Sequence, residues 1–261
     1  MIGIFDSGLG GLSVLAAIAD ALPCADLVYF ADTAHVPYGD KDDAFIRSRV
    51  LCIGQHLAER GCTSIVVACN TATAAAVAEL RKSLPLLPVI GIEPGVKPAA
   101  TSTLSRRIAV LTTPSTARSE RLARLIRQHA GNVCVDVLPC PGWATQVETL
   151  QLGDTDFAES VRQHLEPTLA AGTDRIVLGC THYAFLAPIL TPIVAGRATL
   201  VDVADAVARQ CVRLAAPNSH SRGSLTLLAS TRPERLQAAL PALGLGHLGN
   251  RLSAPARLSK I

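Results

Sequence analysis

Short runs of branched apolar residues recur along the chain and alternate with longer stretches rich in Ala and Leu. The short runs have the length and composition of buried strands, and the longer stretches have those of helices. The predicted strands are Ile2–Phe5, Leu27–Phe30, Ile65–Val67, Val89–Ile92, Ile108–Thr112, Cys134–Leu138, Ile176–Leu178, Thr199–Val201 and Ser224–Leu228. Strands that alternate with helices are typical of parallel sheets, so the pattern predicts the α/β class.

The pattern also contains an internal repeat. Gly61–Thr71 matches Gly172–His182 at a constant offset of 111, and this match aligns Cys69 with Cys180. A weaker match joins residues 2–7 to residues 108–113 at an offset of 106. The repeat predicts two similar lobes, each a mostly parallel sheet flanked by helices.

A stretch rich in Pro, Ser and Thr, residues 94–105, interrupts the alternation of strands and helices. It is the best candidate for the passage between the two lobes. Ligands of open α/β sheets bind beyond the carboxyl ends of the strands. We therefore expect the active site in the cleft between the lobes, where the loops that follow equivalent strands would face each other.

Cys69 and Cys180 each follow a predicted strand. A single cysteine in such a place is commonly a core residue, because cysteine is among the most buried residue types. Here polar pairs follow both, Asn70-Thr71 after the first and Thr181-His182 after the second. Asn70 or Thr71 is expected to cap the next helix, and Thr181 a shorter helix that ends near Pro188. Each sulfur would then lie near a helix N-terminus, which favours the thiolate form.

Two thiols on opposite sides of one tetrahedral carbon could invert that carbon. One thiolate would remove a proton while the opposing thiol supplied another proton to the other face. Only four lysines are present, and none lies in a strand-end loop resembling the cysteine loops, which disfavours a Schiff-base cofactor. We predict that the protein uses no cofactor and no metal. No cysteine pair has the CxxC spacing that structural zinc and thioredoxin-like sites normally need.

Composition narrows the possible partners. The net charge of +3 and the 3% aromatic content do not indicate a nucleic-acid surface, so small-molecule chemistry is the better default. The first 40 residues contain no Lys or Arg, which does not resemble a secretory signal. Residues 176–196 form a long uncharged run, but prolines inside it favour a strand, a loop and a short helix over a membrane span. We expect a cytoplasmic protein with reduced cysteines.

The first strand leads into Asp6-Ser-Gly-Leu-Gly-Gly11. A dinucleotide-binding GxGxxG motif starting at Gly8 would require glycine where the chain has Ser13. A tight turn that exposes backbone amides is the better interpretation, and such a turn could bind a carboxylate. Asp6, at the strand end, could cap a helix, pair with an ammonium group or position a thiol.

Taken together, several segments resemble the glutamate racemase family of the aspartate/glutamate racemase superfamily. They are Asp6–Gly11, Pro37-Tyr-Gly39, Ala68-Cys-Asn-Thr-Ala72, the pair Thr113 and Thr116, and Gly179-Cys-Thr-His-Tyr183, all in family order. The resemblance covers nearly the whole chain. It implies a cofactor-independent enzyme that interconverts L-glutamate and D-glutamate and supplies D-glutamate for peptidoglycan.

The resemblance also assigns roles to residues. Cys69 would take the α-proton of D-glutamate and Cys180 that of L-glutamate, while Asp6, Glu148 and His182 would support the acid-base chemistry. The implied substrate-binding residues are Asp6, Ser7, Tyr38, Gly39, Asn70, Thr71, Thr113, Thr116, Thr181 and His182. Three departures from the family pattern are Ala184 in place of proline, Val203 in place of serine, and the local sequence around Glu148.

The resemblance further implies a first lobe of residues 1–97 plus 208–261, carrying Cys69, and a second lobe of residues 98–207, carrying Cys180. The expected partners are glutamate and a second copy in a homodimer, with no requirement for nucleic acid or membrane. Alternatives remain open: a sister racemase acting on aspartate or a hydantoin, a redox protein that reversibly joins Cys69 to Cys180, an amino-acid-binding module, and a metal site at Cys180 and His182.

Overall fold

The computed structural model of the 261-residue chain describes residues 1–214 and 223–261. It contains two sheets, in which every paired strand is parallel to its neighbours. The first has the order β10-β9-β2-β1-β3-β4, and the second has the order β6-β5-β7-β8. The strands are β1 Ile2–Asp6, β2 Leu27–Ala31, β3 Ser64–Val67, β4 Val89–Gly91, β5 Arg107–Thr112, β6 Cys134–Pro139, β7 Arg175–Leu178, β8 Thr199–Val201, β9 Leu225–Ala229 and β10 Arg257–Leu258.

The α/β class and the two helix-flanked parallel sheets are confirmed. Each of the nine predicted strands lies within one residue of its observed bounds. One observed strand, β10, was not among the predicted strands, because its two residues are both exposed and form no apolar run. Ile2, Ile4 and Phe5 illustrate why the strands were visible: they are buried side chains on a strand that is covered on both faces.

The internal repeat is a repeat of structure. In the first sheet Ile2 pairs with Ser64, and in the second Ile108 pairs with Arg175, so the two central strand pairs have the same register. Gly61 and Gly172 precede β3 and β7, and both have a left-handed backbone, with φ of +85° and +88°. Glycine is suited to that conformation because it has no Cβ. The orders β2-β1-β3-β4 and β6-β5-β7-β8 are therefore equivalent.

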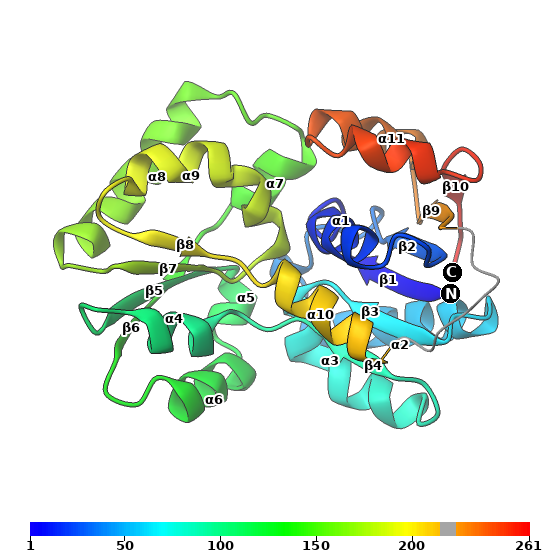
Figure 1. The fold of residues 1–261 in the computed structure, drawn as a ribbon, viewed down its shortest axis with the longest axis horizontal. Coiled ribbons are helices and arrows are strands. Elements are labelled where there is room, and N and C mark those ends of the chain that lie inside the picture. The colour runs from blue at the N-terminus through cyan, green and yellow to red at the C-terminus, as the bar shows by residue number, and fades with distance from the viewer. Residues whose placement is uncertain (215–222) are drawn as a thin grey trace.

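Helices cover both faces of each sheet (Figure 1). The α-helices are α1 Leu12–Ala21, α2 Asp43–Glu59, α3 Asn70–Ser83, α4 Val96–Ser102, α5 Pro114–Ala117, α6 Glu120–His129, α7 Trp143–Glu148, α8 Thr155–Ala170, α9 Ala187–Val194, α10 Ala204–Leu214 and α11 Pro233–Ala242. Three 3₁₀ helices are also described, η1 Tyr38–Asp40, η2 Thr181–Leu186 and η3 Gly246–Arg251. The uncharged run 176–196 is thus strand β7, then η2, then α9, as its prolines indicated.

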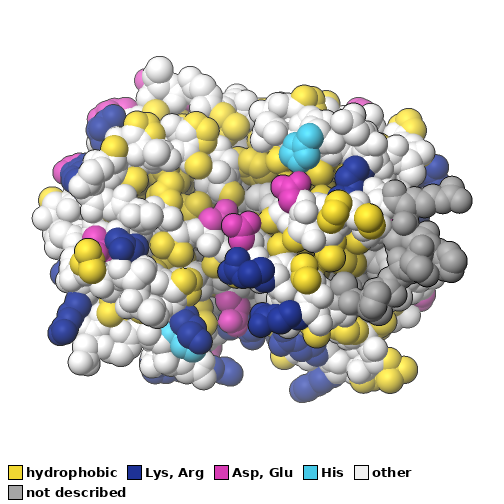
Figure 2. Space-filling view, viewed as in Figure 1, with side chains coloured by type: hydrophobic (Ala, Val, Ile, Leu, Met, Phe, Trp, Pro, Cys, Tyr) yellow, Lys and Arg dark blue, Asp and Glu magenta, His cyan; other side chains and the backbone are white. Residues whose placement is uncertain are grey.

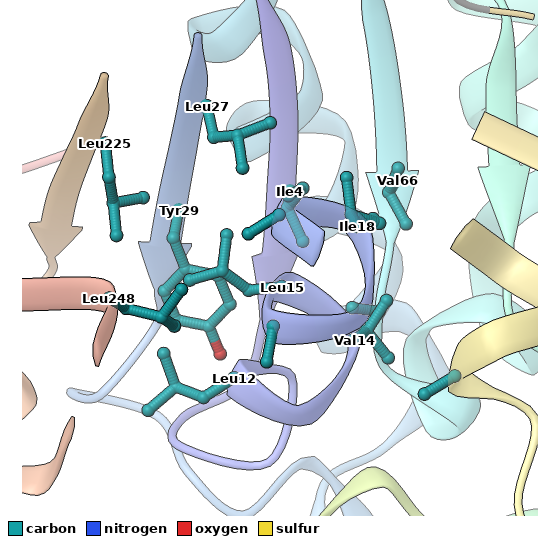
Figure 3. Packing of buried hydrophobic residues seen from close by; sticks show 14 of the residues in the cluster. Ile4, Leu12, Val14, Leu15, Ile18, Leu27, Tyr29, Val66, Leu225 and Leu248 are labelled. Atoms are coloured by element: carbon teal, nitrogen blue, oxygen red, sulfur yellow. The ribbon is translucent and has the colours of Figure 1, made fainter. Parts of the chain in front are cut away.

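The turn that follows β1 lies over a densely packed apolar cluster. Figure 3 shows Leu12, Leu15 and Ile18 of α1 directed onto β1, β2 and β3. Tyr29, fully buried on β2, lies in this cluster and donates a hydrogen bond from its hydroxyl to the carbonyl oxygen of Gly8 at 2.6 Å. Because a buried hydroxyl needs a partner, this bond holds the turn after β1 onto the sheet.

The chain passes from the first sheet to the second between β4 and β5. The Pro/Ser/Thr-rich stretch that predicted this passage contains the short helix α4. The chain returns after β8 through α10, which packs against α1 (Figure 1). The proposed lobe boundaries, at residues 97/98 and 207/208, fall inside α4 and α10. These boundaries stay a prediction. Residues 215–222 of the proposed first lobe lie outside the described residues.

Charged side chains are visible at the boundary between the lobes. On the face shown in Figure 2, Lys and Arg side chains gather in the lower half of the boundary between the lobes, with Asp and Glu side chains beside them. Among the described residues, no helix combines the length and the apolar character that crossing a membrane requires.

Candidate active site

The two cysteines lie at equivalent ends of equivalent strands. Cys69 follows β3 by two residues and Cys180 follows β7 by two residues, and both are buried. The charge of Cys180 is among the causes that raise the pKa of Cys69, so the two sulfurs are close enough to interact and belong to one site. The loop after β1 also reaches the second lobe, where the Thr181 hydroxyl donates to Asp6 Oδ2 at 3.3 Å.

Cys69 itself begins the helix that follows it. Its Sγ accepts a hydrogen bond from the backbone N–H of Ala72 at 3.5 Å, so the predicted cap at Asn70 or Thr71 is wrong. Those two residues form the first turn of α3 instead. The Thr71 hydroxyl is engaged by Thr113, 3.1 Å away, which explains why it does not cap the helix.

The ionisation expected for Cys69 also differs from the prediction. Burial, followed by the charge of Asp6, raises the pKa of Cys69 well above its ordinary value, although the Ala72 N–H opposes the shift. Burial likewise raises the pKa of Asp6, while His182 and a hydrogen bond to Cys69 oppose it. The helix N-terminus is outweighed, and the Cys69 and Asp6 pair retains a proton at neutral pH.

Cys180 has different surroundings. The helix after it is the 3₁₀ helix η2, and no side chain caps it, so the predicted Thr181 cap is wrong because the Thr181 hydroxyl donates to Asp6. Cys180 Sγ lies 3.6 Å from Nδ1 of His182. The other ring nitrogen, Nε2, lies 2.6 Å from Oε1 of Glu148.

His182 is held as a cation. Burial lowers its pKa, but hydrogen bonds to Cys180 and Glu148 outweigh burial and raise the pKa well above the ordinary value of 6.5. Only the imidazolium donates from both ring nitrogens at once. His182 thus places a positive charge against the sulfur of Cys180.

Glu148 joins the two lobes. The Oε1 atom that contacts His182 also accepts from the backbone N–H of Leu9 at 2.6 Å. The approach requires glycine in the turn: a Cβ on Gly8 would lie 2.0 Å from Glu148 Oε1, and one on Gly10 would lie 2.4 Å from His182 Nδ1. Glu148 therefore has a defined place in the site despite the divergent sequence around it.

The amides of the turn after β1 do bind carboxylates, but these belong to the protein. Ser7 N–H donates to Asp6 Oδ1 at 2.7 Å, and Gly11 N–H donates to Asp6 Oδ2 at 2.5 Å. Leu9 N–H donates to Glu148. The turn thus positions the two carboxylates that flank the thiols.

Several predicted substrate-binding side chains come together. The hydroxyls of Thr71, Thr113 and Thr116 form a triangle with edges of 3.1 to 3.2 Å. Asn70 lies beside them on α3, 4% exposed, and neither its Oδ1 nor its Nδ2 has a hydrogen-bond partner among the described residues. An unpaired buried amide costs about 1 to 3 kcal/mol, so this amide is placed for a polar ligand group.

Other predicted residues are placed differently. The Tyr38 hydroxyl donates to Oδ2 of Asp32 at 2.6 Å, which leaves its backbone rather than its hydroxyl for a ligand. Gly39 lies against Thr113, where a Cβ would come within 2.9 Å of the Thr113 Cβ. Ser7 is buried at the end of β1.

The network behind Tyr38 was missed by sequence reasoning. Asp32 is fully buried and receives two bonds of 2.9 Å from Arg49, as well as a 3.0 Å contact from His35. Burial would raise the pKa of Asp32, but hydrogen bonds from Arg49, Tyr38 and His35 hold it below its ordinary value. A signal was available, since Asp32 directly follows the buried strand β2 and Asp6 is the last residue of the buried strand β1.

Within the part of the chain that the structure describes, no three His, Cys, Asp or Glu side chains are grouped as metal ligands. The four lysines remain outside the cysteine loops. The groups available for chemistry at this site are therefore two thiols, two carboxylates, one imidazolium and a set of hydroxyls.

Two duplicated parallel sheets with paired thiols at their carboxyl ends define a two-lobed α/β protein with a two-cysteine site between its lobes. The sequence profile of the family described as Asp/Glu/Hydantoin racemase matches residues 11–211. The chain belongs to this family.

Individual relatives agree with this assignment. A glutamate racemase of Ectopseudomonas mendocina is 44% identical over 246 residues, which cover 93% of this chain and 94% of the relative. The structure of Escherichia coli glutamate racemase with L-glutamate and the activator UDP-MurNAc-Ala has a TM-score of 0.84 at 31% identity, covering 93% of this chain and 94% of that one. The Thermus thermophilus enzyme, solved with β-chloro-D-alanine, has a TM-score of 0.80 at 34% identity, covering 100% and 96%.

Proposed function

We propose that the protein is a glutamate racemase that interconverts L-glutamate and D-glutamate without a cofactor. The observation that carries the proposal is the pair Cys69 and Cys180, buried at equivalent strand ends of two sheets and each in contact with its own acid-base partner. The glutamate racemases among its relatives support glutamate as the substrate.

In the direction from L- to D-glutamate, the Cys180 thiolate removes the α-proton from one face of the substrate. The S–H bond forms as the Cα–H bond breaks, and the electron pair left on Cα is spread into the adjacent carboxylate. The Cys69 thiol then gives its proton to the opposite face, which inverts the centre and leaves Cys69 as the thiolate. His182 stabilises the Cys180 thiolate before the transfer, and Asp6 holds the Cys69 thiol.

In the reverse direction the roles exchange. The Cys69 thiolate takes the α-proton of D-glutamate, and Cys180 supplies the proton to the other face. The low acidity of the α-proton is the main barrier, so the site must stabilise the developing negative charge. Unpaired polar groups at Asn70 and the hydroxyls of Thr71, Thr113 and Thr116 are suited to hold the carboxylates. Ser7, Thr181 and the backbone at Tyr38 and Gly39 complete the proposed binding residues.

The cellular role that follows from this activity is the supply of D-glutamate for peptidoglycan. We propose that the enzyme acts in the cytoplasm, requires neither nucleic acid nor membrane, and forms a homodimer, as its family resemblance implies. Light scattering of the purified protein tests the dimer: a mass near twice 27.3 kDa supports it, and a monomer contradicts it.

The decisive experiment incubates the purified, metal-free protein with L-glutamate in deuterated water. Chiral chromatography should show D-glutamate, and NMR should show deuterium at the α-carbon. The same assay with aspartate and a hydantoin tests the sister activities of the family. Racemisation of one of these without glutamate would replace the substrate, and absence of both inversion and exchange would refute the two-thiol mechanism.

A further inference from the structure

A network of polar side chains supports the segment that carries Tyr38 and Gly39. Asp32 is fully buried directly after β2, and its two carboxylate oxygens accept from Nε and Nη2 of Arg49, each at 2.9 Å. The Tyr38 hydroxyl donates to the same carboxylate at 2.6 Å. Nδ1 of His35 lies 3.0 Å from it as well. Asp32 thus links Arg49, on α2, to Tyr38, on η1.

Arg49 is fully engaged by the protein. Its Nη1 donates to the backbone oxygen of Ile261 at 2.8 Å, so each of its three nitrogens donates to a protein group. Only 12% of its side chain is exposed. The parallel N–H groups of a guanidinium hold a carboxylate in one orientation, which a lysine ammonium does not do. Arg49 is therefore placed to orient Asp32 and not to bind a substrate.

The segment that this network supports lies at the junction of the lobes. The helix η1, which begins at Tyr38, packs against α3 of the first lobe and α5 of the second. A Cβ on Gly39 would lie 2.9 Å from the Cβ of Thr113, whose hydroxyl belongs to the triangle with Thr71 and Thr116. A shift of η1 would therefore alter the wall of the proposed binding site.

The network is separate from the groups that tune the thiols. Among the described residues, the side chains of Arg49 and Asp32 form no hydrogen bond or ion pair with either cysteine, or with the side chains that contact the cysteines. A change in the network should therefore alter the placement of the substrate more than the transfer of protons.

We propose that Arg49 is a positioning residue: through Asp32 and the Tyr38 hydroxyl, it holds η1 where the backbone of Tyr38 and Gly39 binds a carboxylate of glutamate. This inference rests on the proposed function, because glutamate is the ligand and this backbone is one of the proposed binding elements. Arg49 itself does not touch the substrate. A group that binds the substrate and the transition state equally lowers KM and leaves kcat unchanged.

The test is the variant Arg49→Lys, which keeps the positive charge beside Asp32 but loses the two parallel N–H groups. Initial rates from L- and D-glutamate give KM and kcat, and thermal melting gives the loss of stability. The matched control is Arg251→Lys. Arg251 is also half-buried and also donates from its three nitrogens, to three backbone carbonyl oxygens, but it takes no part in the Tyr38 network.

Arg49→Lys should raise KM about fivefold for both enantiomers, with kcat within about twofold of the wild type, because a displaced amide weakens one hydrogen bond without removing it. Arg251→Lys should leave KM unchanged, even if its melting temperature falls by as much. An unchanged KM in Arg49→Lys, an equal rise in KM in Arg251→Lys, or a loss confined to kcat would overturn the positioning role.

Tyr38→Phe is a second variant, which removes only the hydroxyl and leaves Asp32 bonded to Arg49. It should raise KM about threefold, and combining it with Arg49→Lys should raise KM no further than Arg49→Lys alone, because both changes break one chain of contacts. Rises in KM that multiply would overturn the inference. A wild type that racemises glutamate, with both variants at its KM, overturns the positioning role alone. A wild type that does not racemise glutamate overturns the proposed function and this inference with it.

Discussion

The two halves of the site share a backbone and differ in chemistry. Cys69 and Cys180 follow β3 and β7, which pair in the same register with the central strands of their sheets. Cys69 nevertheless forms a hydrogen bond with the carboxylate of Asp6, whereas Cys180 contacts the imidazolium of His182. Burial and a neighbouring negative charge keep a proton on the Cys69 side. On the Cys180 side the neighbouring group is a cation, the imidazolium of His182. The backbone of the two halves is therefore equivalent, and the different partners of the two sulfurs, Asp6 and His182, make the halves chemically unlike.

This difference has a consequence for the order of proton transfers. A two-base racemase needs one thiolate and one thiol at the start of each turnover. In the proposed mechanism, reaction from L-glutamate needs the thiolate at Cys180 and the thiol at Cys69, and Cys69 is the sulfur whose pKa burial raises. Reaction from D-glutamate requires the opposite form, so Cys69 must first lose its proton.

The largest effect is expected from removal of either sulfur. Cys69→Ala and Cys180→Ala should each lower kcat for racemisation by about a thousandfold or more, since general acid-base groups contribute about 10² to 10⁴ and both steps are lost. Circular dichroism starting from each enantiomer measures the rate. Cys24→Ala, at an exposed cysteine, is the control and should leave the rate unchanged. Substantial racemisation by either active-site variant would contradict a mechanism that needs both thiols.

A smaller effect should separate the two halves. His182→Asn and Asp6→Asn should each lower kcat by about ten- to a hundredfold, because each removes a group that sets the ionisation of one sulfur. L- and D-glutamate have equal free energies, so kcat/KM must remain equal in the two directions in every variant. The difference must therefore be sought in primary isotope effects with α-deuterated substrates.

His182→Asn should increase the isotope effect for L-glutamate, whose proton goes to Cys180, more than that for D-glutamate. Asp6→Asn should do the opposite, because it impairs proton removal by Cys69. The wild-type isotope effects, measured with the same substrates, provide the reference. Equal changes for both enantiomers in both variants would mean that Asp6 and His182 serve the site as a whole and that the halves are not independently tuned.

The fold was predictable from the chain because local pattern and tertiary structure agree. Branched apolar runs such as Ile65–Val67 and Ile176–Leu178 form central strands covered on both faces. The repeat placed Cys69 and Cys180 at equivalent positions before any coordinates were considered. β10 was not predictable, since its pairing with β9 depends on neighbours rather than on its own two residues.

The tuning of the site was less predictable. Capping rules place Asn70 and Thr71 at a helix start, but tertiary contacts with the second lobe engage Thr71 and leave Cys69 as the cap. The pKa of Cys69 depends on burial and on Asp6, neither of which a motif reports. The bond from Leu9 to Glu148 spans 139 residues of sequence and required the folded lobes.

The smallest of the expected effects tests the contact that joins the halves. Glu148→Gln keeps the shape of the side chain and removes its negative charge from the ring of His182. Because the hydrogen bond to Glu148 is one of the causes that raise the pKa of His182, that pKa should fall in the variant. His182 would then lose its proton at a lower pH than in the wild type.

The sign of the pH dependence follows from this shift. At a pH low enough to protonate His182 in both proteins, their kcat values should be similar. As pH rises, kcat of Glu148→Gln should fall away earlier, reaching about a three- to tenfold deficit near neutral pH. Gly8→Ala should reproduce this profile, because its Cβ would displace the Glu148 carboxylate. The exposed substitution Glu59→Gln serves as the control, and a Glu148→Gln profile that parallels the wild type at every pH would remove Glu148 from the tuning of Cys180.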